Sequence, residues 1–138
     1  MSHSPNRVFA IALGLVYFAV GIFGFFYTSD ITFFGTQGAA FIGLFGVNPF
    51  LNLIHLVLGV ALLLSGLIGP MIAKLANTGI GALFLLAAFV GLFISWGDNP
   101  LNVFAFNGAD LILHFATAVV LLAVGLGADP IQRASKAA

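Results

Sequence analysis

Two histidines and one aspartate stand within or at the edge of long apolar runs, where polar side chains are costly. His55 lies about one turn inside an apolar run over residues 50–69, and His114 lies at the matching depth of a run over residues 109–127. Two imidazoles at equal depth are suited to axial ligation of a haem iron or a chlorin magnesium. Asp110 precedes His114 by four positions, on the same helix face, and is placed to orient its imidazole.

Other interpretations of these residues stay open. Each histidine can instead hydrogen-bond a carbonyl of a neighbouring helix or loop and so hold the bundle together. Asp110 can instead cap the start of the fourth run, which is the commoner role of an aspartate at a helix start. A three-ligand metal site of His55, His114 and Asp110 is geometrically conceivable, but the chain has no HExxH-like spacing, so we predict no metal site. The candidate cofactor-binding residues are His55, His114, Asp110 and Asn52, which precedes His55 by three positions.

Two asparagines precede the same two apolar runs. Asn48 and Asn107 stand where each run begins. An asparagine side-chain oxygen at such a position accepts a hydrogen bond from a free backbone N–H of the first helical turn. We therefore assign both residues a structural, capping role, at the same end of the helices as the histidines.

The composition indicates that lipid is the solvent of this chain. Its 138 residues are 62% hydrophobic and only 6% charged, against roughly a quarter charged in soluble domains. Four apolar runs approach the length of about 20 residues that crosses a bilayer. They cover approximately residues 8–27, 50–69, 76–96 and 109–127, with all five prolines outside or at their edges. The predicted fold is a single all-α membrane domain of four transmembrane helices over residues 1–138.

The basic residues predict the orientation. Arg7 precedes the first run, Lys74 lies between the second and third, and Arg133 and Lys136 follow the fourth. All lysines and arginines are therefore on one side, which the positive-inside rule makes cytoplasmic. Both termini are then cytoplasmic, and the opposite side carries Asp30, Asp98 and Asp110 without any basic residue.

The first outer loop, residues 31–47, is rich in phenylalanine and glycine. It is too short and too interrupted by glycine for a full span. We expect a short amphipathic or glycine-kinked segment that lies at the outer interface. The second outer loop, residues 97–108, carries an apolar stretch at 103–106 with a similar expected role.

The chain also contains an apparent internal repeat. The second and fourth runs align without a gap at an offset of 59 residues, which superposes His55 on His114 and Gly66 on Gly125. The first and third runs match loosely, through Gly24 and Gly91. We therefore expect two helical hairpins, approximately residues 6–70 and 71–130. Because an even number of spans separates equivalent helices, the repeat is of the parallel type.

The stretches LFGVNPFLNLIHLVLG (residues 44–59) and NGADLILH (residues 107–114) resemble a bacterial membrane family, domain of unknown function 4383. The family pattern resembles Asn-x-x-His-Asn-x-x-His in the second helix and Asp-x-x-x-His in the fourth. It implies a small four-helix protein of the bacterial cytoplasmic (inner) membrane, and no activity. The matching positions here are Asn48, Asn52, His55, Asp110 and His114. Leu51 stands where the family often has a further histidine.

No motif predicts an enzyme: the chain lacks a nucleotide motif, an acidic dyad and a nucleophile–base constellation. The absence of cysteine excludes thiolate metal sites, and the zero net charge makes nucleic acid a poor partner. We expect a small membrane scaffold or accessory subunit that contacts lipid and packs against a larger membrane complex or a second copy. The alternative is a cofactor protein that binds haem, chlorophyll or quinone through His55 and His114.

Overall fold

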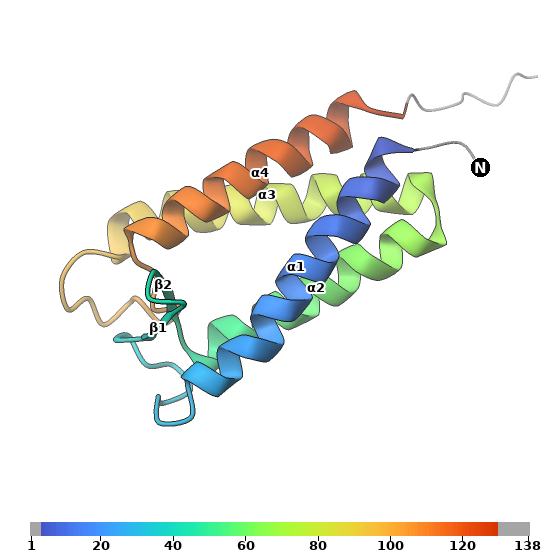
Figure 1. The fold of residues 1–138 in the computed structure, drawn as a ribbon. Helices are drawn as coiled ribbons and strands as arrows, with labels where there is room; N and C mark the ends of the chain where they lie inside the picture. The colour runs from blue at the N-terminus through green and yellow to red at the C-terminus, as the bar shows by residue number, and fades with distance from the viewer. Residues whose placement is uncertain (1–3, 130–138) are drawn as a thin grey trace, which may run out of the picture.

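The computed structural model describes residues 4–129 and contains four long helices (Figure 1). Their bounds are α1 Pro5–Tyr27, α2 Pro49–Ile68, α3 Pro70–Ile94 and α4 Gly108–Gly127. All four are long and apolar enough to cross a membrane. The predicted all-α, four-helix membrane fold is therefore confirmed. His3, Pro130, Arg133 and Lys136 lie outside the described residues.

Prolines and asparagines set where the helices begin. Pro5, Pro49 and Pro70 each take the first position of a helix, where the N–H that proline lacks would have no helical partner. The third helix thus begins at Pro70 rather than near residue 76, because Gly69 alone separates it from α2. Lys74 consequently lies near the start of α3 and not in a connecting loop.

The helices pack as two hairpins, α1 with α2 and α3 with α4 (Figure 1). Glycines make the contact within each hairpin close. A Cβ on Gly14 would lie 2.5 Å from the backbone nitrogen of Leu63, and one on Gly125 would lie 2.8 Å from that of Thr78. Backbones come this near only where no side chain intervenes.

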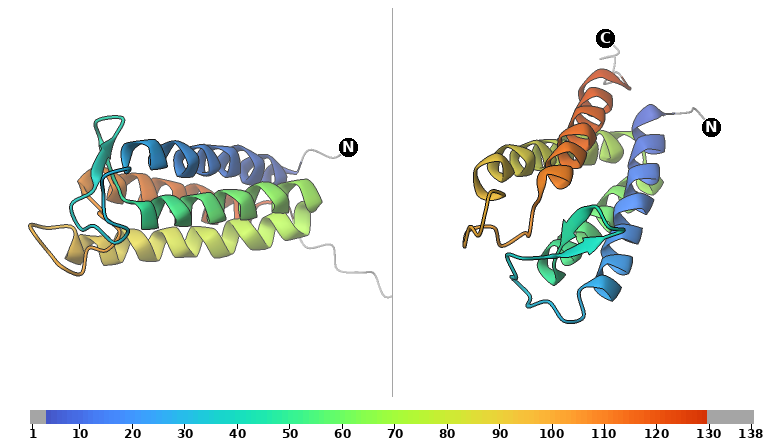
Figure 2. Two further views of the ribbon diagram at one scale, coloured as in Figure 1. Left: turned by 90° about the horizontal axis from the view of Figure 1, so that it is seen from below. Right: turned by 60° about the vertical axis from the view of Figure 1, so that its left-hand side comes forward.

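Both ends of the described chain lie at one end of the bundle, here called the terminal end, and the long connections lie at the other, here called the loop end (Figure 2). The loop end carries the segments 28–48 and 95–107. The first contains a small antiparallel hairpin of β1, Ala39–Phe41, and β2, Phe45–Val47. The segment predicted to lie at the interface therefore includes two short strands and no helix.

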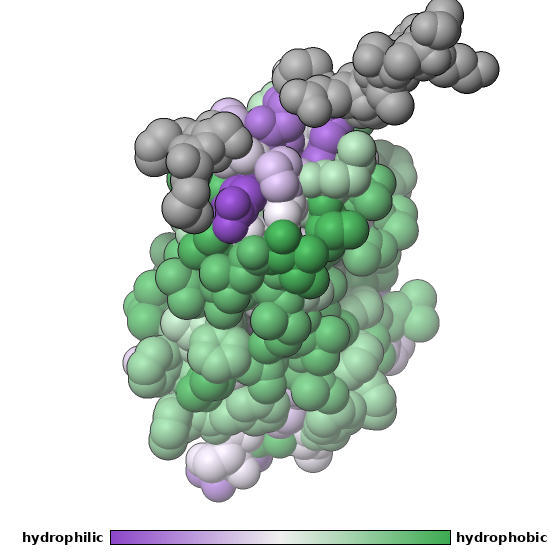
Figure 3. Space-filling model, turned by 90° about the vertical axis from the view of Figure 1, so that its right-hand side faces the viewer, coloured by the Kyte–Doolittle hydropathy of each residue, from purple (hydrophilic) through white to green (hydrophobic). Residues whose placement is uncertain are grey.

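A basic side chain closes each helical hairpin at the terminal end. Arg7 on α1 donates through Nε to the carbonyl of Gly66 at 2.8 Å, and Lys74 on α3 donates to the carbonyls of Ala128 and Asp129 at 2.9 Å each. In both hairpins, a cation from the start of the first helix meets free carbonyls at the end of the second. The polar surface of Figure 3 gathers beside the grey termini, and a wide hydrophobic band separates it from paler residues at the opposite edge.

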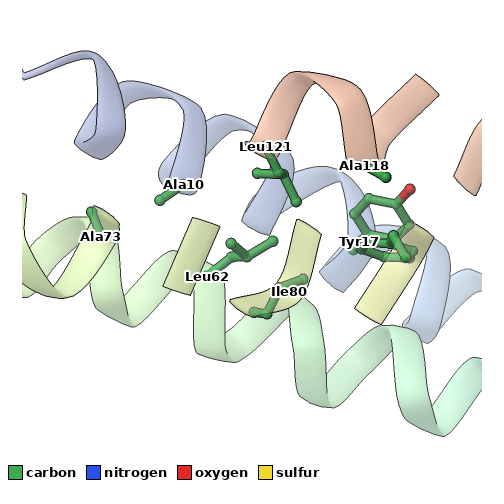
Figure 4. Close-up of a cluster of buried hydrophobic side chains, with 8 residues drawn as sticks. Ala10, Tyr17, Leu62, Ala73, Ile80, Ala118 and Leu121 are labelled. Atoms are coloured by element: carbon green, nitrogen blue, oxygen red, sulfur yellow. The ribbon is translucent and has the colours of Figure 1, made fainter. Parts of the chain in front are cut away.

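An apolar cluster lies between the two hairpins on the terminal side of the histidine pair. Ala10, Leu62, Ile80 and Leu121, one residue from each helix, belong to a single buried cluster (Figure 4). A second buried cluster lies toward the loop end and is formed by Val47, Leu51, Ile94, Phe106 and Leu111. The histidine pair lies between the two clusters along the helices.

Candidate functional site

His55 and His114 meet inside the bundle. Their Nε2 atoms are 3.4 Å apart, and the residues are 3% and 1% exposed. One imidazole belongs to α2 and the other to α4, so the two hairpins contribute one histidine each. The structure thus brings together the two residues that the sequence alignment of the second and fourth runs predicted to lie at equal depth.

The histidines form part of a closed layer of four aromatic rings, one from each helix. We call Tyr17, His55, Phe84 and His114 the four-ring layer. Neighbouring ring centroids are 5.2 Å apart for Tyr17–His55, 5.7 Å for His55–His114, 5.2 Å for His114–Phe84 and 4.6 Å for Phe84–Tyr17. All four residues are buried. Such aromatic contacts fill the centre of the bundle and fix the orientation of both imidazoles.

Sequence reasoning missed half of this layer. The hydroxyl groups of Tyr17 and Thr117 form a hydrogen bond of 2.7 Å, and the ring of Phe84 stacks on that of His114. The signal was present, because Tyr17 aligns with Phe84 at the same offset that aligns Gly24 with Gly91. This alignment of Tyr17 with Phe84 was missed because the first and third runs match only loosely.

The four-ring layer does not fit a macrocycle between the histidines. Axial ligation of a haem or chlorin by two imidazoles needs a wide planar space between them. Here the two Nε2 atoms are within hydrogen-bond distance of each other, and Tyr17 and Phe84 close the layer on the remaining sides. Among residues 4–129, no group of three or more histidine, aspartate or glutamate side chains is placed to hold a metal ion.

Asp110 does not orient His114, so that prediction is wrong. Its Oδ2 accepts hydrogen bonds from the backbone nitrogens of Gly46 at 3.0 Å and Asn107 at 2.8 Å. The carboxylate thus joins β2 to the start of α4. The Nδ1 atoms of both histidines are buried and have no hydrogen-bond partner among the described residues.

Asn52 also makes no hydrogen bond to either imidazole among the described residues. Its amide donates to Thr28 Oγ1 at 3.1 Å, and its Oδ1 is buried without a partner among the described residues. A Cβ on Gly24 would lie 2.1 Å from that oxygen, so a glycine is required where α1 passes the Asn52 side chain. Asn52 thus ties α2 to the end of α1.

Asn48 and Asn107 occupy the N-cap positions of α2 and α4. Each also holds a loop with its amide group. Asn48 Nδ2 donates to the carbonyls of Gly35 at 2.8 Å and Val103 at 2.7 Å, and Asn107 Nδ2 donates to the carbonyl of Leu44 at 2.9 Å. These bonds fasten both connections over the loop end of the bundle.

An apolar pocket of about 340 Å³ lies beside the histidine pair, between α2 and α3. His55 and His114 are its only residues with ionisable side chains, and the remaining lining is apolar: Leu51, Ile54, Leu58, Leu83, Phe84, Leu86, Ala87, Val90, Phe104 and Phe106. Leu83 and Leu86 are 53% and 58% exposed on the apolar surface, so the pocket opens sideways, toward the surrounding lipid. Pockets of this size and lining hold small molecules.

A family model described as Domain of unknown function (DUF4383) matches residues 7–127. No curated protein and no solved structure matches the chain.

Proposed function

Since the chain belongs to the DUF4383 family, whose description assigns no activity, we propose a function from geometry: binding of a lipid-soluble molecule of the quinone class. The ligand enters from the bilayer between α2 and α3. His55 and His114 are the polar groups that meet it. The observation that carries this proposal is the buried imidazole pair at the wall of an apolar pocket that opens toward lipid. The role is binding, and no catalytic residue is assigned.

The hydrogen bonding of the pair supports a ligand with oxygen functions. Each neutral imidazole has one donor and one acceptor nitrogen. When one Nε2 donates to the other, the pair is left with one Nδ1–H donor and one Nδ1 acceptor, and neither atom has a partner among the described residues. Buried groups without partners are costly, particularly within a membrane. A hydroquinone offers O–H donors and hydroxyl oxygen acceptors and so complements both atoms, whereas the oxidised quinone offers carbonyl acceptors to the Nδ1–H alone. Because both Nδ1 atoms are buried, the side chains around them have to move for the ligand to reach them.

The apolar cluster on the terminal side supports binding over transport. Leu62, Ile80 and Leu121 are buried between the four-ring layer and the terminal end. A continuous path for a polar substrate needs polar groups along its whole length. Here the buried polar groups near the histidines stop at Tyr17 and Thr117. The next ones toward the terminal end are Ser65, Asn77 and Asn6, and the apolar side chains of Leu62, Ile80 and Leu121 separate them from the histidines.

A ligand titration tests the proposal. The protein in lipid nanodiscs is heated with increasing menadione, or with menadiol prepared by chemical reduction. A ligand that binds only the folded protein raises the unfolding temperature as its concentration increases. We expect this rise in the wild type and its loss in Ala87→Phe, which fills the pocket and leaves both histidines in place.

The matched control is Ala116→Phe, which fills an apolar groove between α3 and α4 and leaves the pocket unchanged. It should keep the wild-type response. Equal responses from Ala87→Phe and the wild type would show that the ligand binds elsewhere.

The second candidate function is a scaffold or accessory subunit, and the groove between α3 and α4 favours it. The groove measures about 380 Å³, and its walls include Phe89, Ile112 and Phe115, all strongly exposed. A helix of a partner membrane protein or of a second copy fits such a surface. Ala116→Phe should then abolish recovery of the partner in a mild-detergent pull-down, and recovery of only this chain from the wild type would refute the accessory role.

The location proposed is the bacterial cytoplasmic membrane, with both termini in the cytoplasm. The support is the position of Arg7 and Lys74 at the terminal end, against Asp30 and Asp98 in the loop-end connections. Because the chain has no cysteine, single cysteines can report on it. Asp98→Cys should react with an impermeant maleimide in intact cells, whereas Gly69→Cys should react only after permeabilisation; the reverse pattern would invert the orientation.

A further inference from the structure

The turn between β1 and β2 has an unfavourable residue at its first central position. Ile42 and Gly43 have φ values of 48° and 75°. Two successive positive φ values are typical of hairpin turns that carry asparagine, aspartate or glycine at the first position. A β-branched residue rarely adopts this conformation, and such outliers point to a functional constraint. The side chain of Ile42 therefore opposes the local backbone preference.

The same turn exposes its apolar side chains. Ile42 is 62% exposed and Leu44 is 56% exposed. No charged residue occurs anywhere in the segment 31–47. In water, the turn would carry two free-energy costs. One comes from its exposed apolar area and the other from the left-handed backbone conformation of Ile42.

Contacts with the helices place this turn at the level of the bundle's loop end. The ring of Phe41 packs edge-on against Tyr27, the last residue of α1, with centroids 5.1 Å apart. The carbonyl of Leu44 accepts a hydrogen bond from Asn107, the N-cap of α4. In the left view of Figure 2, the teal hairpin runs crosswise to the helices at this end. The turn thus continues the apolar surface of the spanning helices sideways.

We propose that the turn 42–44 inserts into the lipid leaflet at the loop end and anchors the hairpin there. The occupant of this surface is lipid, at the boundary between headgroups and acyl chains, because the turn adjoins the apolar belt that already contacts lipid and carries no charge. Insertion removes Ile42 and Leu44 from water and offsets the unfavourable backbone conformation. This inference is independent of the ligand proposed for the pocket.

Spin labels on single cysteines test the insertion, since the chain has no cysteine of its own. Ile42→Cys and Leu44→Cys are labelled separately with a nitroxide in nanodiscs of phosphatidylcholine and phosphatidylglycerol. Collisions are then measured with oxygen, which partitions into lipid, and with a water-soluble nickel chelate. The lipid reference is Val119→Cys, which is half-exposed in the middle of α4, and the water reference is Asp98→Cys in the second connection.

We expect the labels at positions 42 and 44 to meet oxygen often and nickel rarely, as the label at position 119 does. Nickel access equal to that at position 98 would overturn the proposal. Protection from both reagents would overturn it too, because it would show a protein contact in place of lipid.

Ile42→Asn in the Leu44→Cys background provides a second measurement that does not depend on a label at position 42. Asparagine suits the turn, so the fold in detergent should be at least as thermostable as in the parent. In nanodiscs, the label at position 44 should gain nickel access several-fold. Unchanged nickel access at position 44 would show that Ile42 does not contribute to insertion.

Discussion

At the scale of single residues, the central feature is that His55 and His114 hydrogen-bond each other through their Nε2 atoms. Each imidazole is buried, and the Nε2–Nε2 contact of 3.4 Å is the only hydrogen bond that either side chain makes among the described residues. The free energy of one histidine therefore depends on the presence of the other. This dependence separates a coupled pair from two independent core residues.

Replacing one histidine should cost about as much as, or more than, replacing both. His55→Phe leaves the Nε2 of His114 buried without a partner, a cost of about 1–3 kcal/mol, whereas the double phenylalanine variant removes both polar groups. Unfolding free energies in detergent for the two single variants and the double variant measure this coupling. Additive costs would contradict a shared hydrogen bond.

The sequence predicted which residues belong to this site better than it predicted their partners. Asn48 and Asn107 lie at the N-caps that their place before an apolar run indicates. The hydrogen-bond partner of Asp110 was predicted wrongly because helix periodicity relates residues of one helix only, and it therefore pointed to His114. The actual donors are Asn107, the N-cap residue three positions earlier, and Gly46, which belongs to a loop far away in sequence. Contacts between helix ends and remote loops leave no periodic signal.

At the scale of elements, glycine spacing determines how closely the helices of each hairpin approach. Gly14 of α1 and Gly59 of α2 pack against the backbone of the opposite helix, where a Cβ would lie 2.5 Å from Leu63 N and 2.3 Å from Phe18 N respectively. Gly14 and Gly81 correspond at the offset that also aligns Tyr17 with Phe84, and both are contact positions. These matches support the internal repeat, which stays a prediction.

Gly14→Ala should destabilise the bundle, and Gly79→Ala should not. The first substitution forces α1 away from α2, whereas a Cβ added to Gly79 of α3 would have no atom within 4 Å. At Gly79, alanine should be neutral or stabilise by about 0.5–1 kcal/mol, because glycine is unfavourable in a helix interior. Thermal unfolding of both variants in the same detergent makes the comparison. Equal destabilisation would argue against a close α1–α2 contact.

The helices were predictable because length, hydropathy and proline position all indicate the same spans. The start of α3 was not, since the hydropathy near Lys74 is low although Pro70 favours helix initiation. The β-hairpin was missed because its strands, with three residues each, are too short to show an alternating pattern.

At the scale of the whole molecule, a polar cluster at the terminal end joins the first helix to the last. Asp129, just beyond α4, accepts hydrogen bonds from the hydroxyl of Ser4 and from the amide of Asn6, the latter at 3.0 Å. Asn77 on α3 donates to the side chain of Asn6 at 2.9 Å. The start of α1 is thus tied to both helices of the other hairpin.

This cluster should weaken in acid. The hydrogen bond from Ser4, followed by those from Asn6 and the charge of Lys74, lowers the pKa of Asp129 below its ordinary value of 3.8. A group with a lowered pKa in the folded state contributes stability above its unfolded pKa and loses it as the pH falls through the folded pKa. Between about pH 6 and about pH 3, the wild type should therefore lose more stability than Asp129→Asn. If the stability of the two proteins in detergent depended on pH in the same way, the ionised carboxylate of Asp129 would not contribute to the stability of the fold.

The most direct test of the central claim is to identify what occupies the pocket in the native membrane. The wild type and Ala87→Phe are purified in parallel without added ligand, extracted with organic solvent and analysed by mass spectrometry and absorption. We predict a quinone-class molecule in near-stoichiometric amount with the wild type and its loss from Ala87→Phe, while bulk phospholipid stays equal. Indistinguishable extracts from the two proteins would contradict the claim and return His55 and His114 to a purely structural role.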